Sequence, residues 1–245
     1  MLAGIFHDGS GLGNQLHRYV MTRVLALEKG YQFGMINPEK FKGHGFMQLN
    51  MGVPVSGLLH EYHEAKTLQE NNDVRDYDDK IWDVEDFTLI DGEFQGERYY
   101  QKHLDKIRDW LETEPLEMDD NVCIIGFRGG EYQYIEDLFL KGEYWTQAIQ
   151  KMRNKYPKIQ FEVRTDDPAT AAVFFPHFPI YHEMTMDWRK IRYAKHLIIA
   201  NSSFFILPCL LNEDVKEIIA PKYWAGHNKG YWQLRQNKYD KFTYI

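Results

Sequence analysis

Three apolar segments in the second half of the chain are each followed by polar residues that could bind a phosphorylated sugar. These residues are Arg128, Gly129, Gly130 and Glu131, then Asp166 and Asp167, then Asn201, Ser202, Ser203 and Phe204. A guanidinium beside two glycines can fork onto a diphosphate. Serine hydroxyls and backbone N–H groups at a strand-to-helix turn can bind an anion, and a carboxylate can accept hydrogen bonds from a base or a ribose. Together the three groups predict a nucleotide-sugar site.

Each group also has a common structural interpretation. Arg128 could form an ion pair within the fold, and Asp166 could cap a helix. Their occurrence after three successive strands favours a ligand site, because the carboxyl ends of parallel strands meet at one edge of a sheet, where such folds bind ligands.

A second candidate is the segment "GSGLGNQLHRY" at residues 9–19, which follows the apolar run "LAGIF". Three glycines within five positions, including Gly11 and Gly13, precede Asn14 and an amphipathic pattern. Glycines allow a backbone to approach a bulky ligand closely. The segment therefore predicts a contact with an anionic ligand, with a plain strand-to-helix turn as the alternative.

The hydrophobic pattern predicts the elements that position these residues. Residues 2–6 and 31–36 read as buried strands, and the apolar positions between Asn14, the expected N-cap, and Gly30 recur at helical spacing. Residues 98–112 have the pattern of an amphipathic helix. An apolar strand over 121–127 then begins a second alternation of strands and helices. The patterns predict two doubly wound α/β domains, 1–118 and 119–245.

Composition narrows the class of protein. The chain has 245 residues, 44% hydrophobic, with a net charge of −7, which argues against a general nucleic-acid-binding protein. Cys123 and Cys209 both lie in apolar stretches and are expected to be buried thiols. The "HEYH" segment at 60–63 is expected to be a surface helix face, and no metal-ligand pattern is present. Since neither a signal peptide nor a transmembrane segment is recognisable, a cytoplasmic protein is expected.

Five blocks of the sequence resemble the α-1,2-fucosyltransferases of glycosyltransferase family 11. They are "GSGLGNQLHRYVMTRVLALEKG", "IGFRGGEY", "RTDD", "LIIANSSF" and "EIIAPKYW", in family order between residues 9 and 224. The resemblance implies the GT-B arrangement, in which two Rossmann-like domains face a cleft. It also implies an enzyme that transfers fucose from GDP-fucose to a glycan hydroxyl with inversion, with no essential metal and no cofactor beyond the donor.

The resemblance also implies roles for individual residues. Arg128 would stabilise the leaving diphosphate, Ser202 and Ser203 would donate to phosphate, and Asn201 would shape their turn. Asp166 would contact guanine or ribose, and Asp167 would cap the next helix. The remaining donor contacts implied are Gly11, Gly13, Asn14 and Phe204.

The catalytic base is implied less directly. Glu136 lies eight residues after Arg128, a spacing similar to that of the proposed base in the related α-1,6-fucosyltransferases. Glu131 takes the place of the family motif's Asp, with an ion pair that orients Arg128 as its alternative role. His7 and Asp8, after the first strand, are further candidates, since deprotonation of a hydroxyl needs an imidazole or a carboxylate within hydrogen-bond reach.

Two positions depart from the family motif. Gly126 replaces its histidine and Gly129 its second arginine. These departures leave open a transferase that uses another nucleotide sugar, or a catalytically silent nucleotide- or glycan-binding protein with the same fold.

Overall fold

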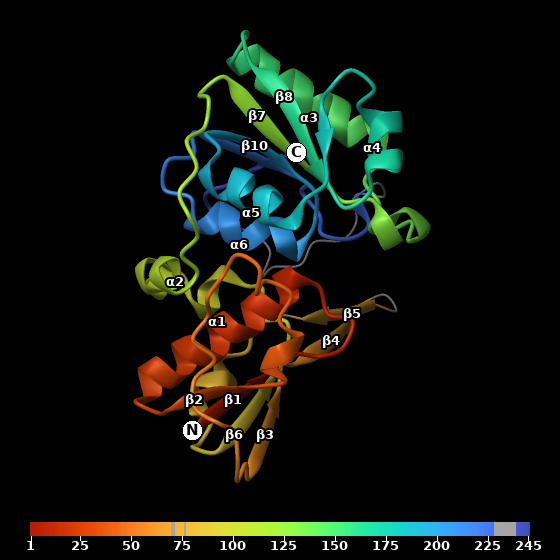
Figure 1. Ribbon diagram of the computed structural model, residues 1–245. Helices are drawn as coiled ribbons and strands as arrows, with labels where there is room; N and C mark the ends of the chain where they lie inside the picture. The colour runs from red at the N-terminus through yellow and green to blue at the C-terminus, as the bar shows by residue number, and fades with distance from the viewer. Residues whose placement is uncertain (70–71, 76, 228–238) are drawn as a thin grey trace. The chain divides into compact units, whose positions relative to one another are not determined.

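The computed structural model describes residues 1–69, 72–75, 77–227 and 239–245. The chain divides into two compact units (Figure 1). Unit 1 comprises the described residues of Met1–Glu112, and unit 2 comprises the described residues from Thr113 onward.

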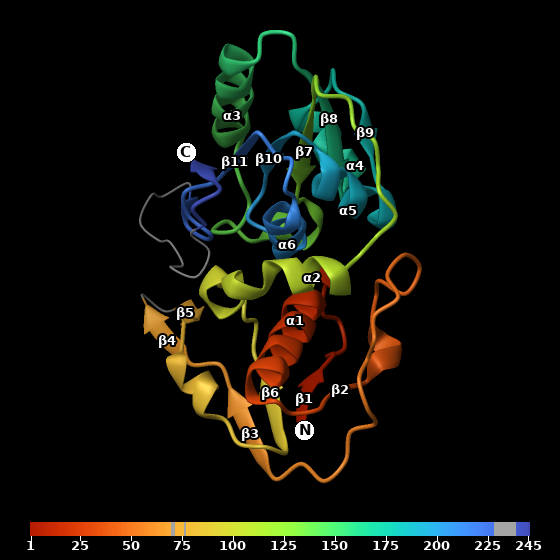
Figure 2. The ribbon, with the colours of Figure 1, turned by 90° about the vertical axis from the view of Figure 1, so that its left-hand side faces the viewer.

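Unit 1 contains a four-stranded sheet in the order β2-β1-β6-β3, in which every pairing is parallel. The strands are β1 (Leu2–Ile5), β2 (Phe33–Ile36), β3 (His60–His63) and β6 (Thr88–Asp91). The helix α1 (Leu12–Lys29) connects β1 to β2 and lies alongside them in Figure 2. It packs closely on β1 because Gly4 has no side chain: a Cβ there would lie 2.4 Å from Thr22 Oγ1.

The N-cap of helix α1 lies three residues earlier than the sequence predicts. Gly11, in extended conformation, is its N-cap, and the Gln15 N–H donates to the Gly11 carbonyl at 3.1 Å. Asn14 therefore lies in the first turn. The predicted end is confirmed, since Gly30 adopts the left-handed conformation (φ 70°) that closes a helix.

The rest of unit 1 is less regular than a doubly wound domain. Within its described residues, α1 is the one α-helix that joins two strands of the sheet. The other elements are 3-10 helices at Pro38–Lys40, Asp79–Asp83, Glu97–Tyr99 and Gln101–His103, an antiparallel hairpin of β4 (Lys66–Gln69) and β5 (Asn72–Arg75), and α2 (Leu104–Trp110).

Two expectations for this region are wrong in detail. The "HEYH" segment forms β3, because it pairs in parallel with β6. The helix expected over 98–112 is reduced to α2 after two 3-10 turns. Tyr99 and Tyr100 are both fully buried in this stretch. In a regular α-helix, the side chains of consecutive residues would point in directions about 100° apart around the axis.

Unit 2 contains a six-stranded parallel sheet in the order β12-β11-β10-β7-β8-β9. Its strands are β7 (Val122–Phe127), β8 (Gln160–Thr165), β9 (Ile180–Tyr181), β10 (His196–Ile199), β11 (Glu217–Ala220) and β12 (Thr243–Tyr244). The crossover helices are α3 (Gly142–Lys155), α4 (Pro168–Phe174), α5 (Met184–Tyr193) and α6 (Ser203–Leu211), as the alternation in the sequence predicts. A short 3-10 helix, Gly130–Tyr134, follows β7.

Aromatic contacts hold the helices of unit 2 in two pairs. Trp145 of α3 meets Phe175, which caps α4, at 5.5 Å between ring centroids. Trp188 of α5 meets Phe204 of α6 at 5.9 Å, and these two helices run side by side in Figure 1. Cys123 and Cys209 are buried as expected, and burial raises the pKa of both thiols.

A buried ion pair links β8 to α5. Asp187 accepts hydrogen bonds from Arg164 Nη1 at 3.3 Å and from the Glu183 N–H at 3.1 Å, and both charged side chains are less than a tenth exposed. Burial raises the pKa of Asp187 from 3.8 to about 6, against the opposing effect of its hydrogen bonds and of Arg164.

This shift predicts a pH dependence of stability. Between pH 4 and 6 the folded state holds a proton on Asp187 that the unfolded state has lost, so stability falls as pH rises. The unfolding free energy of the wild type, relative to Asp187→Asn, should fall by up to about 3 kcal/mol over this range. Denaturant titrations at several pH values measure it.

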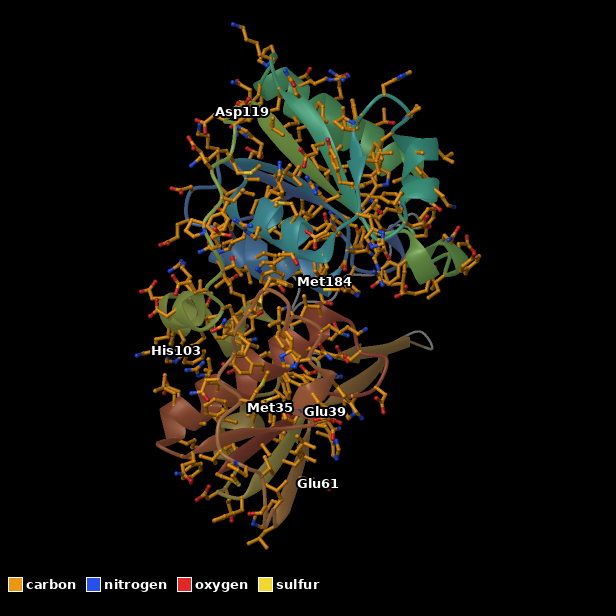
Figure 3. All side chains as sticks on the ribbon, viewed as in Figure 1. Met35, Glu39, Glu61, His103, Asp119 and Met184 are labelled. Atoms are coloured by element: carbon orange, nitrogen blue, oxygen red, sulfur yellow. The ribbon has the colours of Figure 1, made fainter. Side chains whose placement is uncertain are left out.

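The exposed Asp119, labelled in Figure 3, provides a matched control. Asp119→Asn should follow the wild type at every pH. If the difference in unfolding free energy between Asp187→Asn and the wild type did not change with pH, Asp187 would have the same proton affinity in the folded and unfolded states.

Candidate functional site

Unit 2 brings the three predicted groups to one edge of its sheet. The strands β10, β7 and β8 are neighbours and run parallel, so Asn201–Ser203, Arg128–Gly130 and Asp166–Asp167 all follow strands that end at this edge. From β7 the chain first adds β8 and β9 on one side and then β10 to β12 on the other. The edge beside β7 and β10 is therefore a topological switch point, where sheets of this type bind ligands.

Arg128 is held by two carboxylates at this edge. Its guanidinium forms ion pairs with Glu131, three residues later, and with Asp166, whose Oδ2 lies 2.5 Å from Nη1. The guanidinium also lies 5.2 Å from the centre of the Tyr132 ring. The ion-pair alternatives for Arg128 and Glu131 are confirmed. Any anion that binds Arg128 must therefore compete with these two carboxylates.

The two neighbouring aspartates have different tasks. Asp166 Oδ1 accepts the Gly129 N–H at 3.0 Å. Asp167 is the N-cap of α4 and accepts both the N–H and the hydroxyl of Thr170, which lowers its pKa. The predicted cap at Asp167 is confirmed, and the alternative that Asp166 is a helix cap is wrong.

Packing accounts for the glycines around Arg128. A Cβ at Gly129 would lie 2.7 Å from Asp167 Cβ, and Gly130 has a φ of +38°. At Gly126, a Cβ would meet the ring of Phe205 at 3.0 Å. The spaces that the histidine and second arginine of the resembling motif would need are thus occupied by Phe205 and Asp167.

Asn201 and Ser202 are buried where β10 leads into α6. The Asn201 amide donates to the carbonyls of Leu138 and Trp224, so it ties together two loops, while its Oδ1 is buried without a hydrogen bond among the described residues. Ser202 is the N-cap of α6, and its side chain makes no capping hydrogen bond. The turn-shaping role expected for Asn201 agrees with these contacts.

Glu136 lies in a turn just after the 3-10 helix that follows β7. Its side chain is exposed and forms neither an ion pair nor a hydrogen bond with any other described residue. A general base is usually held in place by a hydrogen bond, and no such support for Glu136 exists within the described part of the chain.

The glycine-rich segment of unit 1 also lies at a sheet edge. Gly9 has a φ of +74°, which favours glycine, whereas a Cβ at Gly11 would meet no atom within 4 Å. Gly13 is buried in the first turn of α1. Asn14 Oδ1 accepts from Gln95 Nε2 at 3.1 Å, which ties this turn to the loop after β6.

A buried arginine organises this edge of unit 1. Arg18, 6% exposed, donates from Nε to the Gly92 carbonyl at 2.7 Å. It also donates from Nη1 to Ser10 Oγ and from Nη2 to Glu93 Oε1, both at 3.0 Å. Arg18 thereby joins α1, the glycine-rich turn and the loop after β6.

Asp91, the last residue of β6, lies near three basic side chains at this edge. Its Oδ1 lies 2.9 Å from His7 Nε2, its Oδ2 lies 3.8 Å from His63 Nδ1, and Arg18 Nε lies 4.0 Å away. Arg18, His63, Asp91 and Glu93 are not among the site residues predicted from the sequence. The segment "FTLIDGEF", a strand that ends in carboxylates, is the signal that could have found two of them.

An open pocket of about 730 Å³ lies beside this edge. Its lining includes Met35 (labelled in Figure 3), Asn37, Pro38 and residues 51–58, and it is mainly apolar. The Asn37 amide donates to the Phe6 carbonyl at 3.2 Å, so one wall of the pocket is attached to the residue before His7.

Comparisons with known proteins give low similarity. No family model matches the chain, and no curated protein matches it. Among solved structures, the NodZ α-1,6-fucosyltransferase soaked with GDP-fucose is 13% identical, with a TM-score of 0.45, over 88% of this chain and 93% of that one. The E. coli heptosyltransferase WaaC with ADP is 11% identical, with a TM-score of 0.43, over 91% and 88%. Both TM-scores lie below 0.5, and neither structure assigns an activity to this chain.

Among the described residues, no group of three or more His, Cys, Asp or Glu side chains is arranged to hold a metal ion. No helix in this part of the chain has the length and apolar character needed to cross a membrane.

Glu64 fixes the loop that follows Asp91 and contains Glu93. It is 4% exposed and accepts the N–H groups of Glu93 (2.7 Å) and Phe94 (3.1 Å) and the Tyr99 hydroxyl (3.2 Å). Glu64→Ala removes the charged acceptor of these three donors, and should lower the unfolding free energy by about 2–4 kcal/mol in denaturant titrations.

The control for this prediction is Glu61→Ala on β3, an exposed glutamate labelled in Figure 3. Its effect should stay within about 0.5 kcal/mol. Equal losses for the two variants would contradict an anchoring role for Glu64.

Proposed function

We propose that this protein is a glycosyltransferase that takes a nucleotide sugar, GDP-fucose, and transfers the sugar with inversion to a glycan hydroxyl without a metal ion. The observation that carries the proposal is the meeting of Arg128, Asp166 and the start of α6 at the switch point of a six-stranded parallel sheet. The diphosphate of a nucleotide-sugar donor suits this edge, because a guanidinium and a helix N-terminus both favour negative charge.

The leaving group determines the roles in unit 2. When the bond between the sugar and the diphosphate breaks, negative charge grows on the phosphate oxygen. Arg128 would exchange its two carboxylates for the diphosphate, and Ser202 and Ser203 would donate to it, so that the developing charge is stabilised without a metal. Asp166, released from Arg128, would accept from the base or ribose, and Phe204 would complete the donor site.

Other residues of the proposal lie outside this group. Gly11, Gly13 and Asn14 are proposed to contact the donor from unit 1. Glu136 is proposed as a candidate base from its spacing to Arg128, and Glu131 as the residue that orients Arg128. GDP-fucose is the donor substrate, and no resident cofactor is proposed.

A second candidate function is transfer of a different nucleotide sugar. It is favoured by Phe205 and Asp167, which occupy the space beside Gly126 and Gly129 where the resembling motif has a histidine and an arginine. A donor site without those two side chains suits a different sugar or a protein that binds without turnover.

Calorimetric titration with GDP, UDP, dTDP and CMP, with and without a chelator, tests the proposal. Selective, chelator-insensitive GDP binding is expected. Arg128→Ala should weaken GDP binding by about ten- to a hundredfold, since it removes charged hydrogen bonds to phosphate. Arg153→Ala, at an exposed arginine on α3, is the matched control and should bind GDP like the wild type. Preference for another nucleotide would support the second candidate, and binding of none would exclude this donor site.

Glu131→Gln tests the competition at Arg128 separately. The guanidinium now faces two carboxylates, and removing one charge leaves an electrically balanced pair with Asp166. GDP should therefore bind a few-fold more tightly, with the largest gain at low salt. Weaker binding in this variant would instead show that the Glu131 charge is needed to orient Arg128.

A further inference from the structure

Unit 1 also has a topological switch point, and the roles proposed above assign no catalytic residue to it. From β1 the chain passes through α1 to β2 on one side, and the remaining strands of the sheet, β6 and β3, lie on the other side. His7 lies two residues beyond the end of β1, and Asp91 is the last residue of β6. Their hydrogen bond therefore spans the two strands at the point where such sheets bind ligands.

We propose that His7, oriented by Asp91, is the general base that removes the proton from the acceptor hydroxyl in the proposed sugar transfer. The inference rests on the proposed function, because that hydroxyl is what the imidazole would deprotonate. It replaces Glu136 in this role and adds Asp91 as a positioning residue.

The hydrogen bond between the two side chains fixes the state of the imidazole. A carboxylate can only accept, so His7 Nε2 carries the proton that is donated to Asp91 Oδ1 at 2.9 Å. The lone pair is then on Nδ1, which has no hydrogen bond with any other described residue. The His7 side chain is 41% exposed, so a ligand can reach it.

The surroundings of Asp91 keep it suited to this role. Arg18, itself buried and held by Gly92, Ser10 and Glu93, lies 4.0 Å from Asp91 Oδ1, and His63 lies 3.8 Å from Oδ2. The positive charge of Arg18 therefore lies beside this carboxylate. A charged carboxylate behind an imidazole holds its orientation and stabilises the imidazolium that forms when the proton arrives.

The other base candidates lack such support. Asp8 is 86% exposed and is paired with Lys40 at 2.9 Å. Glu136 is exposed, with no partner among the described residues. His17 is fully buried and bonded through Nδ1 to the Tyr100 hydroxyl. Of these four side chains, His7 is the one that combines an accessible ring with a hydrogen bond to a carboxylate.

The acceptor oxygen forms a bond to the anomeric carbon of the donor sugar while the bond from that carbon to the phosphate oxygen breaks and its electron pair leaves with the nucleoside diphosphate. The acceptor proton moves to His7 Nδ1, and the imidazolium later releases it to water. The pocket of unit 1 is lined in part by Asn37, whose amide donates to the carbonyl of Phe6, the residue before His7.

The test measures GDP release from GDP-fucose, with water and with a pool of neutral oligosaccharides as acceptors, across a range of pH. His7→Gln should lower the rate by about 10²–10⁴-fold and remove the fall in rate on the acid side of the profile, with GDP affinity unchanged in calorimetry. Asp91→Asn should lower the rate of GDP release by about tenfold or more and shift the acid limb of the pH profile. Asp91→Glu should restore part of the lost rate.

Two controls separate the outcomes. His60→Gln, at an exposed histidine on β3, should behave as the wild type does. If His7→Gln released GDP at the wild-type rate while Glu136→Gln lost GDP release, the inference would be overturned and the proposed function would stand. Absence of nucleotide binding or of GDP release in the wild type would overturn both.

Discussion

Each unit depends on the strand from which the chain adds neighbours first on one side and then on the other, β1 in unit 1 and β7 in unit 2, and both strands pair in parallel on each side. Parallel pairing forces every strand of a sheet to end at the same edge, and it requires a crossover between successive strands. Where the crossovers turn to opposite sides of the central strand, that edge is left open. The polar residues that follow β1 and β7 are therefore gathered by backbone geometry, whatever their chemistry.

The two edges use guanidinium groups in opposite ways. Arg18 is buried and donates to a carbonyl, a hydroxyl and a carboxylate, so removing the Glu93 carboxylate would leave a costly buried charge. It acts as a fixed anchor around which Asp91 and Glu93 are arranged. Arg128 is partly exposed and is paired with two carboxylates, which a more highly charged phosphate can displace.

The sequence predicted local features well where one interaction dominated. Uninterrupted apolar runs gave buried strands, Gly30 ended α1 and Asp167 capped α4, because each depends on a few neighbouring residues. Prediction from the sequence failed where contacts between residues far apart in the chain determine the local structure. The "HEYH" segment has no strong local preference and became a strand through pairing with β6. Residues 98–103 left the α-helical path, and both Tyr99 and Tyr100 are buried in the resulting 3-10 turns.

The sequence by itself determined which side chains follow the ends of strands in unit 2, since a strand's end and the residues after it are adjacent in the chain. Only the tertiary structure decided which of them are bound to one another. The pairing of Arg128 with Asp166 joins residues 38 positions apart, and that of His7 with Asp91 joins residues 84 apart. Such pairs depend on strand order, and strand order is set by the burial of whole sheets, which local patterns do not encode.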